Sequence, residues 1–129
     1  MTAGRDQTAG NLATVMREEA VGSVVIADGD RPVGIVTDRD LVVEVLEPRR
    51  DSTETTAGDL MTETLVTVET GTGIMEATET MSEHGVRRLP VVDGEGSLAG
   101  LVTLDDLTRL FADELTDLAA VIERESPPY

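Results

Sequence analysis

The motif Gly-x-x-Thr-x-x-Asp occurs twice in this chain of 129 residues. The two copies consist of Gly34, Thr37 and Asp40, and of Gly100, Thr103 and Asp106, and we expect Gly34 and Gly100 to be turn glycines. A Thr followed three residues later by a carboxylate at the start of a helix is typical of a capping box, which satisfies free backbone N–H groups. The same turn offers N–H groups and the positive end of a helix dipole to a phosphate, while the Asp can accept hydrogen bonds from a ribose diol. The residues alone leave the helix cap and the nucleotide-binding turn as alternatives.

Arginine supplies all the permanent positive charge, because the chain contains no Lys. Arg39 lies inside the first motif, where it is either a phosphate ligand or an exposed residue of the first helical turn. Arg87 and Arg88 are neighbours on a predicted strand, so the alternation of that strand directs them to opposite faces, and only one can serve a given cleft. We select Arg88, which aligns with Ser23, as the candidate phosphate ligand; a surface salt bridge is the alternative.

Both motifs belong to a longer internal repeat, in which residues 16–41 align with residues 81–107 and the second turn carries one extra residue. Each copy has the pattern of an amphipathic helix, a strand, an Asp-Gly turn, a second strand and a further helix. Helical spacing marks the first helix of each copy: Leu12, Val15 and Met16, and then Ile74, Ala77, Thr78 and Met81. The pattern predicts strands over 23–27, 33–37, 89–92 and 98–103, and helices that begin at 38 and 104.

A stretch with a Pro, small polar residues and no apolar period separates the two copies and predicts a linker. The predicted organisation is a first repeat over 1–47, a linker over 48–58, a second repeat over 59–124 and a tail over 125–129. Residues 59–68 form a lead-in and a strand that open the second repeat, whereas the matching residues of the first repeat would precede Met1. We therefore expect the first repeat to lack its opening strand, unless a partner or the N-terminal segment covers the gap.

The last predicted helix is long, about 104–123, and carries Phe111, Leu115, Leu118 and Ile122 at intervals of four, three and four. Such spacing can form a seam between two helices, which predicts a homodimer. Packing of the helix on its own sheet is the alternative.

The chain carries 26 acidic residues against 10 basic ones, a net charge of -16. A nucleic-acid partner is excluded because no basic stripe is present to neutralise phosphates. The acidic residues are dispersed along the whole chain, which is typical of proteins from salt-loving archaea, where a Debye length of about 3 Å in molar salt screens self-repulsion. The absence of Cys and the single His argue against a metal site. No apolar run reaches the ~20 residues of a membrane span and no signal peptide is recognised, so we expect a cytoplasmic protein.

The sequence resembles tandem CBS domains, named after cystathionine beta-synthase and also called a Bateman module. The similarity rests on DLMT (59–62), VTV (66–68), MSEHGVRRLPVVD (81–93) and GLVTLDDL (100–107) in the second repeat, and on VGSVVIADGDRPVGIVTDRDL (21–41) in the first. It extends over about residues 8–122. The resemblance implies an α/β fold of two β-α-β-β-α repeats that pack about a pseudo-twofold axis and leave two clefts.

The resemblance also implies a function. Clefts of this family commonly bind AMP, ADP, ATP or S-adenosylmethionine, and the module regulates an enzyme or transporter without catalysing a reaction, with no obligatory cofactor and no metal. By position, Asp40 and Asp106 would bind ribose, and Thr37 and Thr103 would face phosphate. The residues that would flank adenine are Leu65, Val66, Val86 and Pro90. The first repeat has no counterpart of Leu65, so we expect its cleft to be incomplete.

Two other functions remain open. A ligand-free module that only assembles with itself or with another chain would use the motifs as helix caps alone. The stretch IVTDRDL also resembles the Asp-x-Asp start of haloacid dehalogenase-like phosphatases, whose carboxylates supply a nucleophile and a Mg²⁺ ligand. The missing Lys and the Thr-Leu-Asp-Asp of the second copy argue against this enzyme class.

Overall fold

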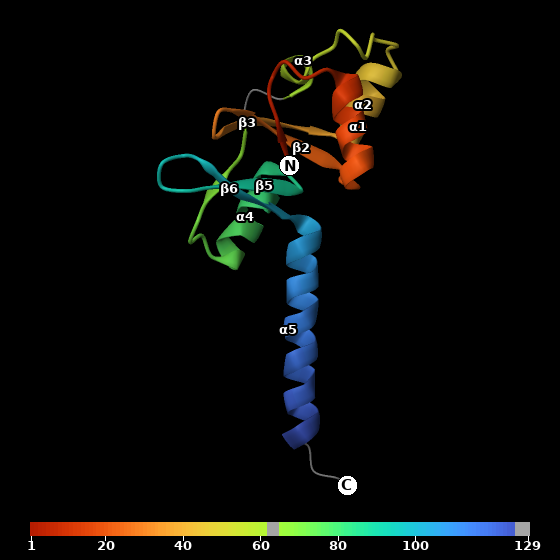
Figure 1. Ribbon diagram of the computed structural model, residues 1–129. Coiled ribbons are helices and arrows are strands. Elements are labelled where there is room, and N and C mark those ends of the chain that lie inside the picture. Colours follow the sequence, from red (N-terminus) through yellow and green to blue (C-terminus); the bar gives the residue numbers. More distant parts are fainter. Residues whose placement is uncertain (62–64, 126–129) are drawn as a thin grey trace.

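The computed structural model describes residues 1–61 and 65–125 as two halves, each with a three-stranded sheet and helices packed on it (Figure 1). The strands are β1 (Thr2–Ala3), β2 (Ser23–Asp28), β3 (Arg31–Thr37), β4 (Val68–Glu69), β5 (Arg88–Val92) and β6 (Leu98–Thr103). The helices are α1 (Ala9–Glu19), α2 (Asp38–Leu41), the π-helical η1 (Val42–Leu46), α3 (Ala57–Leu60), α4 (Ile74–His84) and α5 (Leu104–Glu125). This mixed α/β architecture with two repeats confirms the predicted fold class.

The two sheets have the same topology, β1-β2-β3 and β4-β5-β6. Thr2 pairs in parallel with Val25, as Val68 does with Val91, and the remaining pair in each sheet is an antiparallel hairpin. The prediction that the first repeat lacks its opening strand is therefore wrong. The N-terminal segment supplies β1, which was one of the two ways of closing the gap, and two ladder residues suffice because the neighbouring β2 is long and buried.

The ends of the first helix in each half follow from local chemistry. The Thr8 side chain accepts a hydrogen bond from Asn11 N and so caps α1. At the other end Ala20 adopts the left-handed conformation (φ 54°, ψ 44°), and Gly85 does the same after α4 (φ 63°, ψ 34°). Both residues act as C-terminal caps, although only Gly adopts this conformation without a steric cost.

Helix α3 belongs to the core of the first half, although its last two residues, Asp59 and Leu60, fall within the predicted second repeat over 59–124. Ala57 and Leu60 are buried together with Leu12 and Val45. The preceding linker is hydrogen bonded to the N-terminal segment, with Ala9 N donating to Thr55 O at 2.8 Å and Ala57 N donating to Gln7 O at 2.8 Å. The linker is thus an ordered part of the first half rather than a free tether.

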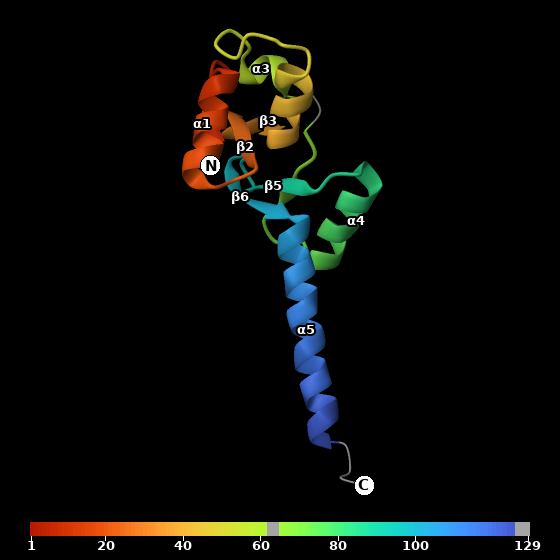
Figure 2. The same cartoon turned by 90° about the vertical axis from the view of Figure 1, so that its right-hand side faces the viewer.

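The two halves contact each other through the turns of their hairpins. Leu98 N donates to Asp30 O at 2.7 Å, and Arg31 Nη2 donates to Glu95 O at 3.0 Å. Helix α5 leaves the second half and projects away from both sheets in both views (Figures 1 and 2). None of the described helices has the length and apolar character needed to cross a membrane.

Candidate functional site

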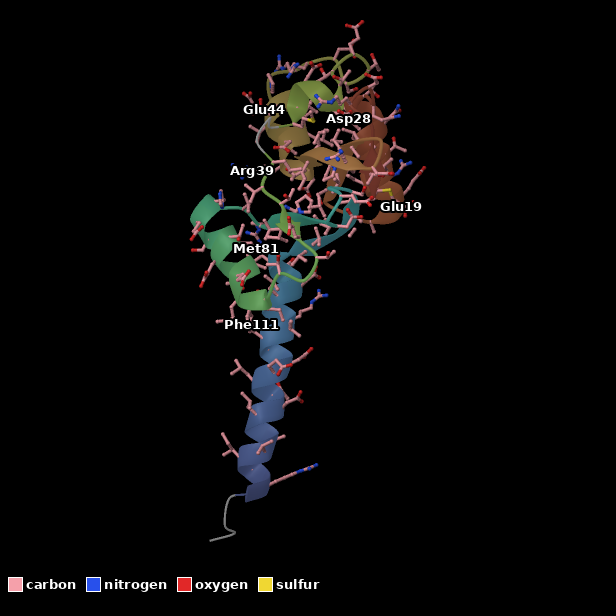
Figure 3. The ribbon with its side chains drawn as sticks, turned by 90° about the vertical axis from the view of Figure 1, so that its left-hand side faces the viewer. Glu19, Asp28, Arg39, Glu44, Met81 and Phe111 are labelled. Carbon is pink, nitrogen blue, oxygen red and sulfur yellow. The ribbon has the colours of Figure 1, made fainter. Side chains whose placement is uncertain are left out.

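A cleft of about 490 Å³ lies between the two halves, next to the first copy of the repeated motif. Its lining residues are Ile35, Thr37, Asp38, Arg39, Asp40, Leu65, Val66, Val86, Arg87 and Arg88. The volume lies within the range of roughly 300–1,000 Å³ that is typical of small-molecule sites. Seven of the residues selected from the sequence are thus brought together in one cleft, and Figure 3 shows Arg39 at the level where the two halves meet.

The Thr and Asp of the motif form a helix cap. Thr37 N donates to Asp40 Oδ2 at 2.8 Å, and Asp40 N donates to Thr37 Oγ1 at 3.1 Å. Thr103 and Asp106 make the same reciprocal pair, with both distances 3.1 Å. The capping interpretation is therefore confirmed. It does not exclude a ligand, because the backbone bond engages only Oδ2 of Asp40, and a carboxylate has two acceptor oxygens.

A third capping box shows that this chemistry alone does not mark a site. Thr56 and Asp59 exchange the same two hydrogen bonds at the start of α3, outside the cleft. The pKa of the Asp59 carboxyl is lowered, first by the bond that it accepts from the Thr56 backbone N–H and then by its interaction with the Thr56 hydroxyl. What distinguishes Asp40 from Asp59 is therefore its place in a cleft between the halves.

Three arginines line the cleft, which differs from the expectation that only one of Arg87 and Arg88 would reach it. Strand β5 begins at Arg88, so Arg87 lies before the strand and is not subject to its alternation. Opposite them lies Gly22, where a Cβ atom would be 3.2 Å from Asp38 Oδ2 and 3.6 Å from Arg88 Nη2. The absence of a side chain at this position leaves room for both charged groups.

None of the cleft arginines forms an ion pair with a carboxylate among the residues that the structure describes. The ion pairs among the described residues are Arg5–Asp28 and Arg17–Glu18, so the surface salt bridge considered for Arg88 is not formed there. The lining contains three Arg against two Asp, whereas the whole chain contains 26 acidic and 10 basic residues. The charge balance is therefore locally reversed, and unpaired guanidinium groups are well suited to a phosphate or carboxylate.

The apolar wall of the cleft comes mainly from the second half. Leu65, Val66 and Val86 are half-buried there, and Ile35 joins them from β3 of the first half. The first motif thus faces the apolar residues of the second repeat. The expectation that the first cleft is incomplete is therefore wrong. Leu65 of the second repeat lines the cleft of the first motif, so a counterpart of Leu65 in the first repeat would line the cleft of the second motif.

The second motif lines only a small hollow. Its volume is about 80 Å³, and its lining includes Thr103 and Asp105 together with Arg87 and Arg88. Asp106 is exposed and lines neither this hollow nor the large cleft. The hollow is far below the volume of a typical ligand pocket.

Three further residues lie elsewhere than expected. Pro90 is fully buried in β5, paired with Leu101, so it cannot flank a ligand. Gly34 and Gly100 lie within β3 and β6, opposite irregularities in the neighbouring strands, and not in turns. Strand glycines commonly accompany such bulges or a close approach of another segment.

Sequence reasoning missed Ile35, Asp38 and Arg87 as lining residues. Ile35 could have been found, because it lies two residues before Thr37 on the same strand and therefore on the same face. Asp38 and Arg87 carry no such local signal. Among the described residues there is no group of three or more His, Cys, Asp or Glu side chains that could hold a metal ion.

Comparison with known proteins identifies the family of the chain. The family model for the CBS domain matches residues 1–47 and 57–113. An uncharacterised protein of Methanopyrus kandleri is 38% identical over 130 residues, and the chain spans 64% of that relative's length. Hypoxic response protein 1 of Mycobacterium tuberculosis is 38% identical over 107 residues, which cover 82% of this chain and 74% of that protein.

Solved structures share the fold. The crystal structure of hypoxic response protein I, which contains two coordinated zinc ions, has a TM-score of 0.75 at 36% identity and covers 84% of this chain and 88% of its own. A CBS domain protein from Pyrobaculum aerophilum in complex with AMP has a TM-score of 0.74 at 26% identity, with coverage of 82% and 81%. With a family match over most of its residues, this chain belongs to the proteins with paired CBS domains.

Proposed function

We propose that the protein is a non-catalytic sensor that binds an adenosine nucleotide in the cleft beside Thr37 and Asp40. In this proposal the free oxygen of Asp40 accepts hydrogen bonds from the ribose hydroxyls. Thr37 and the three guanidinium groups bind the phosphate, and adenine lies against Leu65, Val66 and Val86.

The observation that carries the proposal is a group of three arginines next to an apolar wall, none of which pairs with a carboxylate in 1–61 or 65–125. In a chain with a net charge of -16, an arginine cluster without partners in the described residues implies an anionic ligand. The cluster favours AMP, ADP or ATP over S-adenosylmethionine, whose sulfonium group is cationic. The AMP complex of the Pyrobaculum protein supports the same ligand class.

The remaining parts of the proposal concern the setting of this sensor. The protein acts as a cytoplasmic homodimer that regulates an enzyme or a transporter, and its dispersed acidic residues adapt it to the high salt of a halophilic archaeon. Ligand binding alters the packing of the two halves, because the cleft is built from both of them.

Calorimetric titration in ~2 M KCl, where the screening length is short, tests the ligand. AMP, ADP, ATP and S-adenosylmethionine are titrated into the wild type and into Asp40→Asn, which keeps an oxygen for the cap but loses the charge. Loss of charge-assisted hydrogen bonds of roughly 1.5–3 kcal/mol predicts a nucleotide Kd weaker by about 10- to 100-fold. Asp59→Asn is the matched control, since it alters the same type of capping box outside the cleft.

Asp106→Asn is a second control, because Asp106 forms the same type of capping box and does not line the large cleft. Unchanged binding in Asp59→Asn and Asp106→Asn, together with weak binding in Asp40→Asn, supports the proposal. No heat with any ligand in a folded sample would leave the ligand-free assembly module as the function. A phosphatase assay with Mg²⁺ tests the remote enzymatic alternative.

A further inference from the structure

Helix α5 continues well beyond the part of the chain that resembles a CBS domain. The family match ends at residue 113, whereas the helix continues to Glu125. Every side chain from Phe111 to Arg124 is exposed. Helical stability in proteins comes mostly from packing of an apolar face, and a short unsupported helix is marginal in water. This projecting segment therefore needs a covering surface.

The exposed face of α5 carries a seam that is apolar at every position except Thr108, whose hydroxyl donates to Leu104 O. Its positions are Leu104, Thr108, Phe111, Leu115, Leu118 and Ile122, at alternating intervals of four and three residues. Leu115 is 67% exposed and Leu118 is 60% exposed. Alternation of three and four is the repeat of a two-stranded coiled coil, in which these residues lie at the core positions.

The base of the seam opens into a groove between α4 and α5. This groove has a volume of about 360 Å³, and its lining includes Met81, Val86, Leu104, Leu107 and Phe111 but no charged side chain. Met81 of α4 and Phe111 of α5 both line this groove, and Figure 3 labels them at different heights along it. The uncharged surface therefore continues from the groove into the seam on the projecting part of α5.

We propose that this surface binds α5 of a second copy of the chain, in parallel, so that the two helices form a coiled coil and the two grooves face each other. A twofold axis along the seam places each core residue opposite its own equivalent. The neutral groove and seam offer no charge for a partner of different sequence to recognise, whereas they complement themselves. The inference rests on the proposed homodimer and is independent of the proposed nucleotide.

The charges beside the seam determine the orientation. In a parallel pair Glu114 lies next to Ala119 of the partner subunit, and Leu107 lies next to the partner subunit's Ala112, so no carboxylate faces another across the seam. In an antiparallel pair with full overlap Glu114 would face Glu114 of the partner subunit. Like charges at these flanking positions disfavour that orientation.

The absence of Cys from the chain allows a direct test of the orientation by cross-linking. Leu118→Cys is expected to form a disulfide-linked dimer under mild oxidation, because equivalent residues meet in the parallel pair. In the antiparallel pair Leu118 would lie opposite Thr108 of the partner subunit, and the two Cys residues would be about 15 Å apart along the axis, too far for a disulfide. Ala120→Cys is the matched control, since it lies on the opposite face of the helix.

The mass in solution provides the second measurement. Light scattering is expected to give twice 13.7 kDa for the wild type and for the control Ala120→Glu. Leu118→Glu is expected to have the mass of the monomer, while its circular dichroism spectrum remains that of a folded protein. A monomeric wild type overturns the homodimer itself. A dimer that survives Leu118→Glu, or equal cross-linking through Ala120→Cys, overturns this interface while leaving the homodimer intact.

Cross-linking only in a mixture of Thr108→Cys and Leu118→Cys overturns the parallel orientation. Nucleotide titration of Leu118→Glu tests the cleft separately from the interface.

Discussion

Met61 packs so closely over Gly34 that a Cβ atom on the glycine would lie 2.7 Å from both the Cβ and the sulfur of Met61. Met61 directly follows α3, and Leu60 is anchored in the core of the first half. Gly34 thus allows the segment between the repeats to cross β3 at close range. At the equivalent Gly100 no atom of the described part of the chain lies within 4 Å of such a Cβ.

We expect Gly34→Ala to destabilise the protein by about 1–3 kcal/mol, as other overpacked sites do. The Met61 side chain cannot simply rotate away, because its Cβ is one of the contacting atoms. Gly100→Ala is the matched control and should be neutral or stabilising by up to about 1 kcal/mol, since Ala restricts the unfolded chain. Urea denaturation at constant salt measures both, and equal effects at the two positions would contradict this interpretation of Gly34.

The two left-handed helix caps predict opposite effects of reciprocal substitutions. Ala20 adopts φ 54°, where a side chain is strained, and its counterpart Gly85 adopts φ 63°. Ala20→Gly should stabilise the protein by about 0.5–1 kcal/mol, and Gly85→Ala should destabilise it by a similar amount. Thermal denaturation of the two variants and of the double variant measures the effects. A loss of stability in Ala20→Gly would show that the greater entropy of the unfolded chain outweighs the strain relieved at the helix cap.

The net charge of -16 predicts a strong dependence of stability on salt. Repulsion between dispersed carboxylates is screened as the Debye length falls from about 10 Å at 0.1 M to about 3 Å at 1 M. The melting temperature should therefore rise as KCl is added. An uncharged osmolyte at matched osmolality is the control, because it reproduces solute exclusion without screening charge. A melting temperature that is constant or falls with KCl would refute the prediction.

The pKa values of two exposed carboxyls near the linker are lowered by threonine neighbours. The side-chain hydrogen bond with Thr53 is the main cause for Asp51, and the backbone bond from Thr56 is the main cause for Asp59. A lowered pKa in the folded state contributes stability above the ordinary value of 3.8, and that contribution is lost as the pH falls through the lowered pKa. The capping box of α3 should therefore weaken only below about pH 4.

Carboxyl ¹³C titration by NMR measures the pKa values of Asp51 and Asp59 and so tests the cause of each lowered value separately. Thr53→Val should raise the Asp51 pKa towards its ordinary value and leave Asp59 unchanged. Thr56→Val should raise the Asp59 pKa only in part, because the backbone N–H of residue 56 still donates. A complete return of the Asp59 pKa in Thr56→Val would assign the shift to the hydroxyl instead.

The sequence by itself determined the features that depend on neighbours along the chain. The internal repeat, the strand over 98–103 and the helix starts at Asp38 and Leu104 are correct, because alternation, helical periodicity and capping act within a few residues. The spacing of the Thr–Asp pairs likewise indicated the helix cap, as one of two alternatives, and both pairs form it. The apolar seam of α5 was visible for the same reason.

Only the tertiary structure decided which distant segments meet. Sequence could not show that Thr2–Ala3 completes the first sheet or that α3 packs into the first core, since such short segments carry little propensity and are held by their neighbours. Nor could it show that the first motif faces Leu65 and Val66 of the other half, which makes the first cleft the large one. Contacts between residues far apart in the chain depend on how the halves pack, and no local pattern encodes that packing.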